Sequence, residues 1–204
     1  MINSLPVAKF LAVAIAVGSL TACDRAESPA TAAPAAPDSA IRLTAGIQDI
    51  MAHMIDPAAD FLWESVSSTV TVDGVEDKQP RTDEEWKEFR RHAIVLTESA
   101  NLILMQGRHV ASEGRQLEDH GTPGNLTAAQ SEAAIAADRA SFVAFGQALH
   151  DVGVAFLKAA DDRNPQAVLD AGETMDGVCE GCHLKFWYPG QKIPVFPDQA
   201  PESK

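Results

Sequence analysis

The sequence PQAVLDAGETMDGVCEGCHLKFWY, residues 165–188, carries the most informative pattern in this chain. Asn164-Pro165 predicts the start of a helix, because Pro is favoured at the first helical position, and Pro189 predicts its end. Apolar and small residues recur in it every three or four positions: Val168, Gly172, Met175, Cys179, Cys182 and Phe186. Both cysteines therefore belong to the stripe of this helix that faces the core.

Residues 179–183 read Cys-Glu-Gly-Cys-His, and this spacing is typical of the covalent attachment of c-type haem. Two residues three apart lie on one helix face, so both thiols can reach the two vinyl groups of one porphyrin. His183 then offers an imidazole nitrogen to the iron as proximal axial ligand. We expect one haem c, bound through Cys179 and Cys182.

A Cys-x-x-Cys pair can also be half of a zinc site, a redox dithiol, a disulfide or a coincidence. A structural zinc site usually needs a second Cys or His pair at ligand spacing, and the remaining cysteine is the distant Cys23. A thioredoxin-type dithiol lies where a strand enters a helix, and no alternating strand and helix pattern surrounds residues 165–188. These alternatives stay open but fit less well.

The N-terminus has the layout of a secretory signal. Lys9 precedes the apolar run Phe10–Gly18, which is too short to span a bilayer. The run ends in Leu20-Thr21-Ala22-Cys23, which resembles a bacterial lipoprotein box. This resemblance implies that residues 1–22 form a signal peptide and that Cys23 is the lipidated first residue of the mature chain; a free or disulfide-bonded Cys23 is the alternative. Asp24 slightly favours retention at the inner membrane, on the periplasmic side.

The rest of the chain divides by composition. Residues 23–39 are rich in Pro and Ala and predict a tether, residues 40–190 have the length of one domain, and residues 191–204 form a Pro-rich tail. The formal net charge is −13, and removing the signal peptide takes away one positive charge, Lys9. Such a surface disfavours nucleic acid and favours partners with basic docking surfaces.

Four amphipathic helices are expected in residues 40–190. The first runs along Leu43–Leu62, with Pro57 kinking or interrupting it near Asp56. The others start at Thr82, at Thr127 and at Asn164-Pro165; Glu85 and Gln130 complete capping boxes for two of them. The expected fold class is all-α, a four-helix bundle with the haem on its last helix.

Two connecting segments have features of their own. Val72-Asp73-Gly74 predicts the turn of a hairpin between the first two helices. The stretch Gln106–Leu126 contains four glycines and is long for a structureless loop. We therefore expect a short helix near Val110–Glu118, over the edge of the haem.

The motif position, the helix count and the apolar residues of the first helix resemble the cytochrome c′ class, the four-helix-bundle c-type cytochromes with Cys-x-x-Cys-His near the end of the last helix. The resemblance covers roughly residues 40–188. It implies that a residue of the first helix faces the iron opposite His183: a Leu there leaves the iron five-coordinate, and a Met makes it six-coordinate. Matching Ile47–Met54 to the family pattern puts Met51 at this position.

The distal ligand itself stays open at this point. Met51 and Met54 are three apart on the same stripe, so either thioether could face the iron, or both could simply fill the core. His53 lies off the stripe and is expected at the surface. Arg108 is a candidate partner for a haem propionate and equally an ordinary loop arginine.

No constellation of a catalytic acid, base or nucleophile is evident, so the chain is predicted not to be an enzyme. The expected function is that of a membrane-tethered monohaem cytochrome carrying single electrons between redox partner proteins in the periplasm. Two alternatives are a five-coordinate haem protein that binds NO or CO, and a haem subunit of a larger oxidoreductase. The sequence leaves open whether the chain acts alone or as a homodimer.

Overall fold

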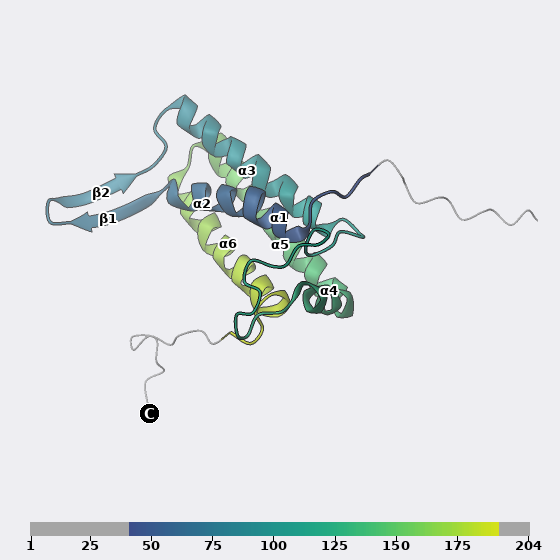
Figure 1. The fold of residues 1–204 in the computed structure, drawn as a ribbon. Coiled ribbons are helices and arrows are strands. Elements are labelled where there is room, and N and C mark those ends of the chain that lie inside the picture. The colour runs from purple at the N-terminus through teal and green to yellow at the C-terminus, as the bar shows by residue number, and fades with distance from the viewer. Residues whose placement is uncertain (1–40, 192–204) are drawn as a thin grey trace, which may run out of the picture. The chain divides into compact units, whose positions relative to one another are not determined.

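The structure is a computed structural model that describes residues 41–191; the signal peptide, Cys23, the tether and residues 192–204 lie outside the described residues. It is mostly helical, as expected, with one small sheet (Figure 1). The elements in chain order are α1 (Ile47–Ile50), a π-helical segment (Met51–Ile55), α2 (Asp56–Glu64), β1 (Ser67–Thr71), β2 (Gly74–Lys78), α3 (Asp83–Leu104), α4 (Ala128–Ala137), α5 (Arg139–Asp162) and α6 (Pro165–Phe186).

The first predicted helix is a continuous rod, residues 47–64, whose middle is wound as a π-helix. The Asp56 N–H donates to the carbonyl of Met51, five residues back. Pro57 follows, and because it has no N–H it donates no hydrogen bond to the preceding turn. The interruption predicted near Asp56 takes the form of a change from π to α winding, in a helix that continues to Glu64.

The predicted hairpin is also confirmed. β1 and β2 pair antiparallel from Ser67 with Lys78 to Thr71 with Gly74, and the hairpin projects away from the helices (Figure 1). Gly74 has φ +131°, a conformation that glycine adopts at no steric cost.

Helix α3 starts and packs as its sequence predicts. Thr82 Oγ1 accepts a hydrogen bond from the Glu85 N–H, and Glu85 Oε2 accepts one from the Thr82 N–H, at 3.2 and 2.8 Å. The Thr82 cap thus satisfies N–H groups that the first turn leaves free. The predicted stripe is buried throughout: Trp86, Phe89, Ala93, Leu96, Ala100 and Ile103.

Helices α3 and α5 run antiparallel in close contact. Arg90 pairs with Asp161 near one end of the contact. A Cβ placed on Gly153 would lie 2.2 Å from Thr97 Oγ1, and one placed on Gly146 would lie 2.5 Å from a methyl carbon of Leu104. The two glycines therefore permit the helix separation that buries Phe89 against Phe156.

The third predicted helix is wrong in one respect, since it is divided into α4 and α5. The Thr127 cap with Gln130 is present, but Asp138 leaves helical geometry with φ −136° and ψ 61°. Its carboxylate accepts the Ser141 N–H at 3.0 Å, which starts α5, and a hydrogen bond from Lys185 of α6 at 2.6 Å. Asp138 thus ends α4, caps the start of α5 and forms an ion pair that links it to α6.

Helix α6 begins where predicted. Asn164 Oδ1 accepts the Ala167 N–H at 3.2 Å, and Pro165 occupies the first turn. The helix packs on α5 and α2, and Phe186 meets Phe142 edge to face with ring centroids 5.5 Å apart. Val168, Gly172 and Met175 are buried with it, so the predicted stripe faces the core.

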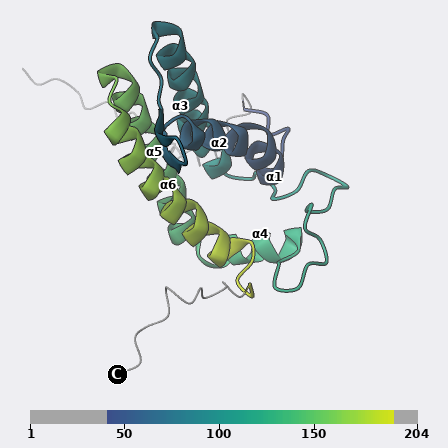
Figure 2. The same ribbon diagram turned by 90° about the vertical axis from the view of Figure 1, so that its left-hand side faces the viewer.

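The helix predicted near Val110–Glu118 is wrong: between α3 and α4 the described chain forms turns. Its local backbone bonds close single turns, such as that from the His120 N–H to the Leu117 carbonyl, while the carbonyls of His109 and Val110 accept N–H groups of α1. Figure 2 shows this loop passing from α1 to the region of α4.

Helix α5 is long and apolar enough to cross a membrane by length and composition, with a mean hydropathy of 1.3. Its side chains Phe142, Leu149 and Phe156 belong to the core between α3 and α6. A single helix of this kind is weak support for a membrane span.

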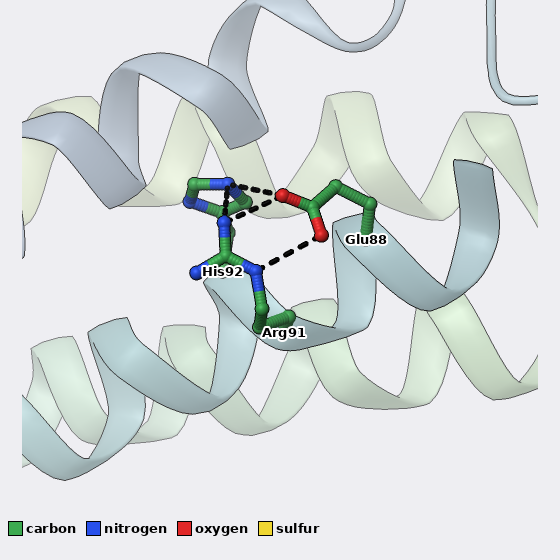
Figure 3. Close-up of polar contacts among 3 residues, drawn as sticks. All are labelled: Glu88, Arg91 and His92. Carbon is green, nitrogen blue, oxygen red and sulfur yellow. Dashed lines mark hydrogen bonds and ion pairs between the residues drawn. The ribbon is translucent and has the colours of Figure 1, made fainter. Parts of the chain in front are cut away.

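His92 joins α2 to α3. Its ring stacks on Phe61 with centroids 3.9 Å apart, and its Nε2 lies 2.7 Å from Arg91 Nη2 and 3.3 Å from Glu88 Oε1 (Figure 3). Burial and then the Arg91 charge lower the pKa of His92, while Glu88 raises it. The folded protein therefore binds this proton more weakly than the unfolded chain does.

The close approach at Gly153 predicts a contrast between two substitutions. Gly153→Ala should destabilise the fold by about 1–3 kcal/mol because the new methyl collides with Thr97. Gly177→Ala, on an exposed part of α6 with nothing within 4 Å, should stabilise it by about 0.5–1 kcal/mol. Denaturant unfolding of both variants measures this; equal effects would show that the α3–α5 contact is not as tight as described.

The His92 cluster predicts a pH effect of definite sign. Since the pKa of folded His92 lies below its ordinary value of 6.5, stability should fall as pH drops from above 6.5 toward the folded pKa. Glu88→Gln should lower the pKa of His92 further, and Arg91→Gln should raise it. NMR titration of the imidazole checks both, and a shift of the same sign in the two variants would refute the arrangement.

Candidate functional site

A cavity of about 570 Å³ lies between α6, the rod 47–64 and α5. Its size is within the range of about 300–1,000 Å³ that is common for cofactor sites. Its lining comes from these elements, from α3, from the loop after it and from the residues after α6. The lining residues are Gln48, Met51, Ala52, Ile55, Asp56, Ala59, Asp60, Trp63, Ile103, Glu118, Asp119, Phe145, Gly146, Leu149, Met175, Asp176, Val178, Cys179, Cys182, His183, Trp187 and Tyr188.

Helix α6 presents Cys179, Cys182 and His183 to this cavity. All three are partly buried, and the two cysteines are free. Gly181 between them lets α6 approach α5, since a Cβ there would lie 3.0 Å from the Phe145 ring. The three motif residues thus lie along one wall, on a helix fixed by close packing.

The thiols of Cys179 and Cys182 are protonated near neutral pH in this structure. Burial raises the pKa of each to about 11, and Asp176 adds to the effect at Cys179. Redox dithiols of the thioredoxin type instead contain a thiol with a lowered pKa. Burial also lowers the pKa of His183, which keeps the imidazole neutral and its nitrogen lone pair free to bind a metal.

Two aromatic side chains flank His183. The rings of Trp187 and Tyr188 lie 5.8 and 5.6 Å from the imidazole ring, centroid to centroid. The Tyr188 hydroxyl donates to Glu180 Oε2 at 2.8 Å, which fixes the tail of the motif onto its own helix. The Trp187 Nε1–H is buried without a partner among the described residues, and it is shielded from the cavity as well.

The two candidate methionines of the rod 47–64 differ in their relation to the cavity. Met51, at the start of the π-helical segment, lines the cavity, whereas Met54 packs against the core and is not among the lining residues. His53 is exposed and also lies outside the cavity. π-Helical turns recur at functional sites in proteins, and this one borders the cavity directly.

The remaining polar lining is acidic. Asp56 and Asp60 from α2, Asp176 from α6, and Glu118 and Asp119 from the loop line the cavity, and no Lys or Arg is among its described lining residues. Arg108, a candidate for a propionate, instead donates to the carbonyls of Leu102 and Ala45, at 2.7 and 2.6 Å. Its guanidinium therefore links the start of the loop to the backbone of α3 and to the residues before α1.

The sequence did not indicate Gln48 and Trp63 as cavity residues. Gln48 lies three positions before Met51, so the helical period could have placed it on the same face. Trp63 is 50% exposed and shares a face of α2 with Asp56 and Asp60. The π-helical segment just before α2 adds one residue to its turn, and this extra residue turns that face of α2 toward the cavity. The periodicity of the sequence alone does not reveal a π-helical turn.

The donor set fits a covalently bound haem. Two thiols and an imidazole from α6 and a thioether from the rod 47–64 line the same cavity, and apolar side chains from several helices complete its lining. Within residues 41–191, no group of three or more His, Cys, Asp or Glu side chains is arranged to hold a metal ion directly.

Comparison of the chain with known protein families, with curated proteins and with solved structures gave no match.

Proposed function

We propose that this chain is a monohaem c-type cytochrome that carries single electrons on the periplasmic side of a bacterial membrane. The observation that carries the proposal is the single cavity with Cys179, Cys182 and His183 on one wall and Met51 on the other. Electron transfer needs only a bound haem, whose iron alternates between the ferrous and ferric states.

In this proposal each residue of the cavity has a defined task. The thiols of Cys179 and Cys182 add across the two vinyl groups of the porphyrin, so each sulfur–carbon bond forms without an oxidant. His183 is the proximal iron ligand, and its low pKa keeps it neutral for that role. Met51 is the distal ligand, and a thioether there stabilises ferrous iron and raises the reduction potential.

A porphyrin supplies four nitrogen ligands to its iron, so the protein needs to offer only the two axial ligands. This agrees with a site in which no three protein side chains converge on a point among the described residues. Apolar side chains such as Phe145, Leu149 and Met175 line part of the same cavity. The acidic lining, without Lys or Arg among its described residues, favours propionates that point toward solvent.

The proposed fold is a four-helix bundle of the cytochrome c′ type. Its helices are the rod 47–64, α3, α5 and α6, and it is supported by the contacts of α3 with α5, of α5 with α6 and of α2 with both α3 and α6. Cofactor sites in such bundles are built from facing side chains, as here. Partners with basic surfaces and a lipid tether at Cys23 complete the proposal.

Absorption spectra of the matured protein test the ligands. We expect a six-coordinate, low-spin haem that ignores added CO in the wild type. Met51→Ala should become high-spin and bind CO, because the distal site is then open. Met54→Ala is the matched control and should keep the wild-type spectrum, since Met54 does not line the cavity.

Low-spin bands that survive Met51→Ala would remove Met51 from the proposal. A wild type that binds CO at once would instead support the alternative of a five-coordinate gas-binding protein.

The proposed lipid anchor predicts a change of cell fraction. The wild type should sediment with the membranes and incorporate labelled fatty acid, whereas Cys23→Ser should do neither, because acyl chains provide the attachment. Fractionation and labelling check this. Equal fractionation of the two proteins would contradict the anchor and leave the haem site untouched.

A further inference from the structure

The loop between α3 and α4, residues 106–126, bridges the two walls of the cavity (Figure 2). Val110 and Leu117 of this loop are only 4% exposed and belong to the hydrophobic core. Packing thus fixes it between α1 and the C-terminal end of α6.

The first half of the loop is attached to the helix that carries Met51. The N–H groups of Ile47 and Gln48 donate to the carbonyls of His109 and Val110, both at 2.9 Å. The Ser112 hydroxyl donates to the carboxylate of Asp49. The start of the rod 47–64 is therefore bonded to the loop at three successive residues.

The second half is attached to the chain just after α6. The Leu126 N–H donates to the Trp187 carbonyl at 2.8 Å, and the Gly190 N–H donates to the Gly124 carbonyl at 3.1 Å. A Cβ on Gly124 would lie 2.8 Å from the Gly190 backbone, and Gly124 has φ +92°. This contact therefore requires a glycine.

One side chain holds the middle of the loop against the cavity. Gln48 is 7% exposed and lines the cavity; its Oε1 accepts the Glu118 N–H at 2.9 Å, and its Nε2 donates to the Gln116 carbonyl at 3.4 Å. Glu118 and the next residue, Asp119, are the two residues of this loop that line the cavity. Opening the loop would break both bonds and leave a buried amide unpaired.

We propose that Gln48 is a positioning residue: it holds residues 116–119 over the cavity and thereby restricts the access of external ligands to the haem iron. This rests on the proposed function, since it concerns the iron of the bound haem. Gln48 acts through the loop backbone and does not bind the iron itself. With the loop held in this way, the haem exchanges electrons with its partners while small molecules are kept from its iron.

A substitution in the loop can remove one of these bonds without touching Gln48. Glu118 is the second residue of the turn Leu117–His120, which is closed by the His120 N–H on the Leu117 carbonyl at 3.0 Å. Pro is favoured at that turn position, so Glu118→Pro removes the N–H that Gln48 binds and suits the turn. Glu118→Ala is the matched control, because it removes the same carboxylate and keeps the N–H.

The measurement is the rate of CO association with the reduced holoprotein, made in a Met51→Ala background so that the distal position is open in every variant. We expect Glu118→Pro to raise the rate constant about tenfold, since a net hydrogen bond of about 1.4 kcal/mol changes an opening equilibrium by that factor. Gln48→Leu, which fills similar volume and makes neither bond, should raise it at least as much. Glu118→Pro should also exceed Glu118→Ala about tenfold, because the two variants lack the same carboxylate and only Glu118→Ala keeps the N–H that Gln48 binds.

Rates for Glu118→Pro and Gln48→Leu equal to that of Glu118→Ala, in variants that carry haem and melt cooperatively, would overturn the role of Gln48 and leave the proposed function standing. If Glu118→Pro fails to fold, Gln48→Leu decides alone. A matured protein without covalent haem would overturn both proposals.

Discussion

The geometry of α6 is the constraint on which the rest of the structure depends. Cys179 and Cys182 are three residues apart on the side of the helix that faces the core, so their thiols and the His183 imidazole open into one cavity. Gly181 brings this part of α6 against Phe145, and Phe186 anchors its end against Phe142. A helix rotated by one residue would keep the two thiols on one face but turn that face away from the cavity.

The opposite wall depends on an irregularity. A rod of regular α-helix across residues 47–64 would keep one apolar face, but the π-helical segment next to Pro57 changes the face between Met51 and α2. Met51 and Met54 are both partly buried against the core, but Met51 lines the cavity and Met54 does not. The start of this rod is bonded to the loop at Gln48 and Asp49, so the chain just before the irregular segment is fixed to the loop.

Local signals in the sequence were enough to predict most elements. The caps at Thr82, Thr127 and Asn164 involve neighbours within three residues, and the hairpin turn is equally local. The break at Asp138 was missed because its ion pair with Lys185 joins residues far apart in sequence. The helix expected near Val110 was wrong for a similar reason, as the carbonyls of His109 and Val110 bond to the distant α1. Sequence could not separate Met51 from Met54, since both fall on one stripe, nor foresee the clamp at Gln48.

The account depends most directly on a thioether link between α6 and a porphyrin. Tandem mass spectrometry of the proteolytic peptide that contains residues 179–183, from protein matured in a host that attaches haem c, tests that link. We predict one haem per chain, with both Cys179 and Cys182 modified and neither open to alkylation. Two unmodified cysteines that accept an alkylating reagent after denaturation would contradict the account.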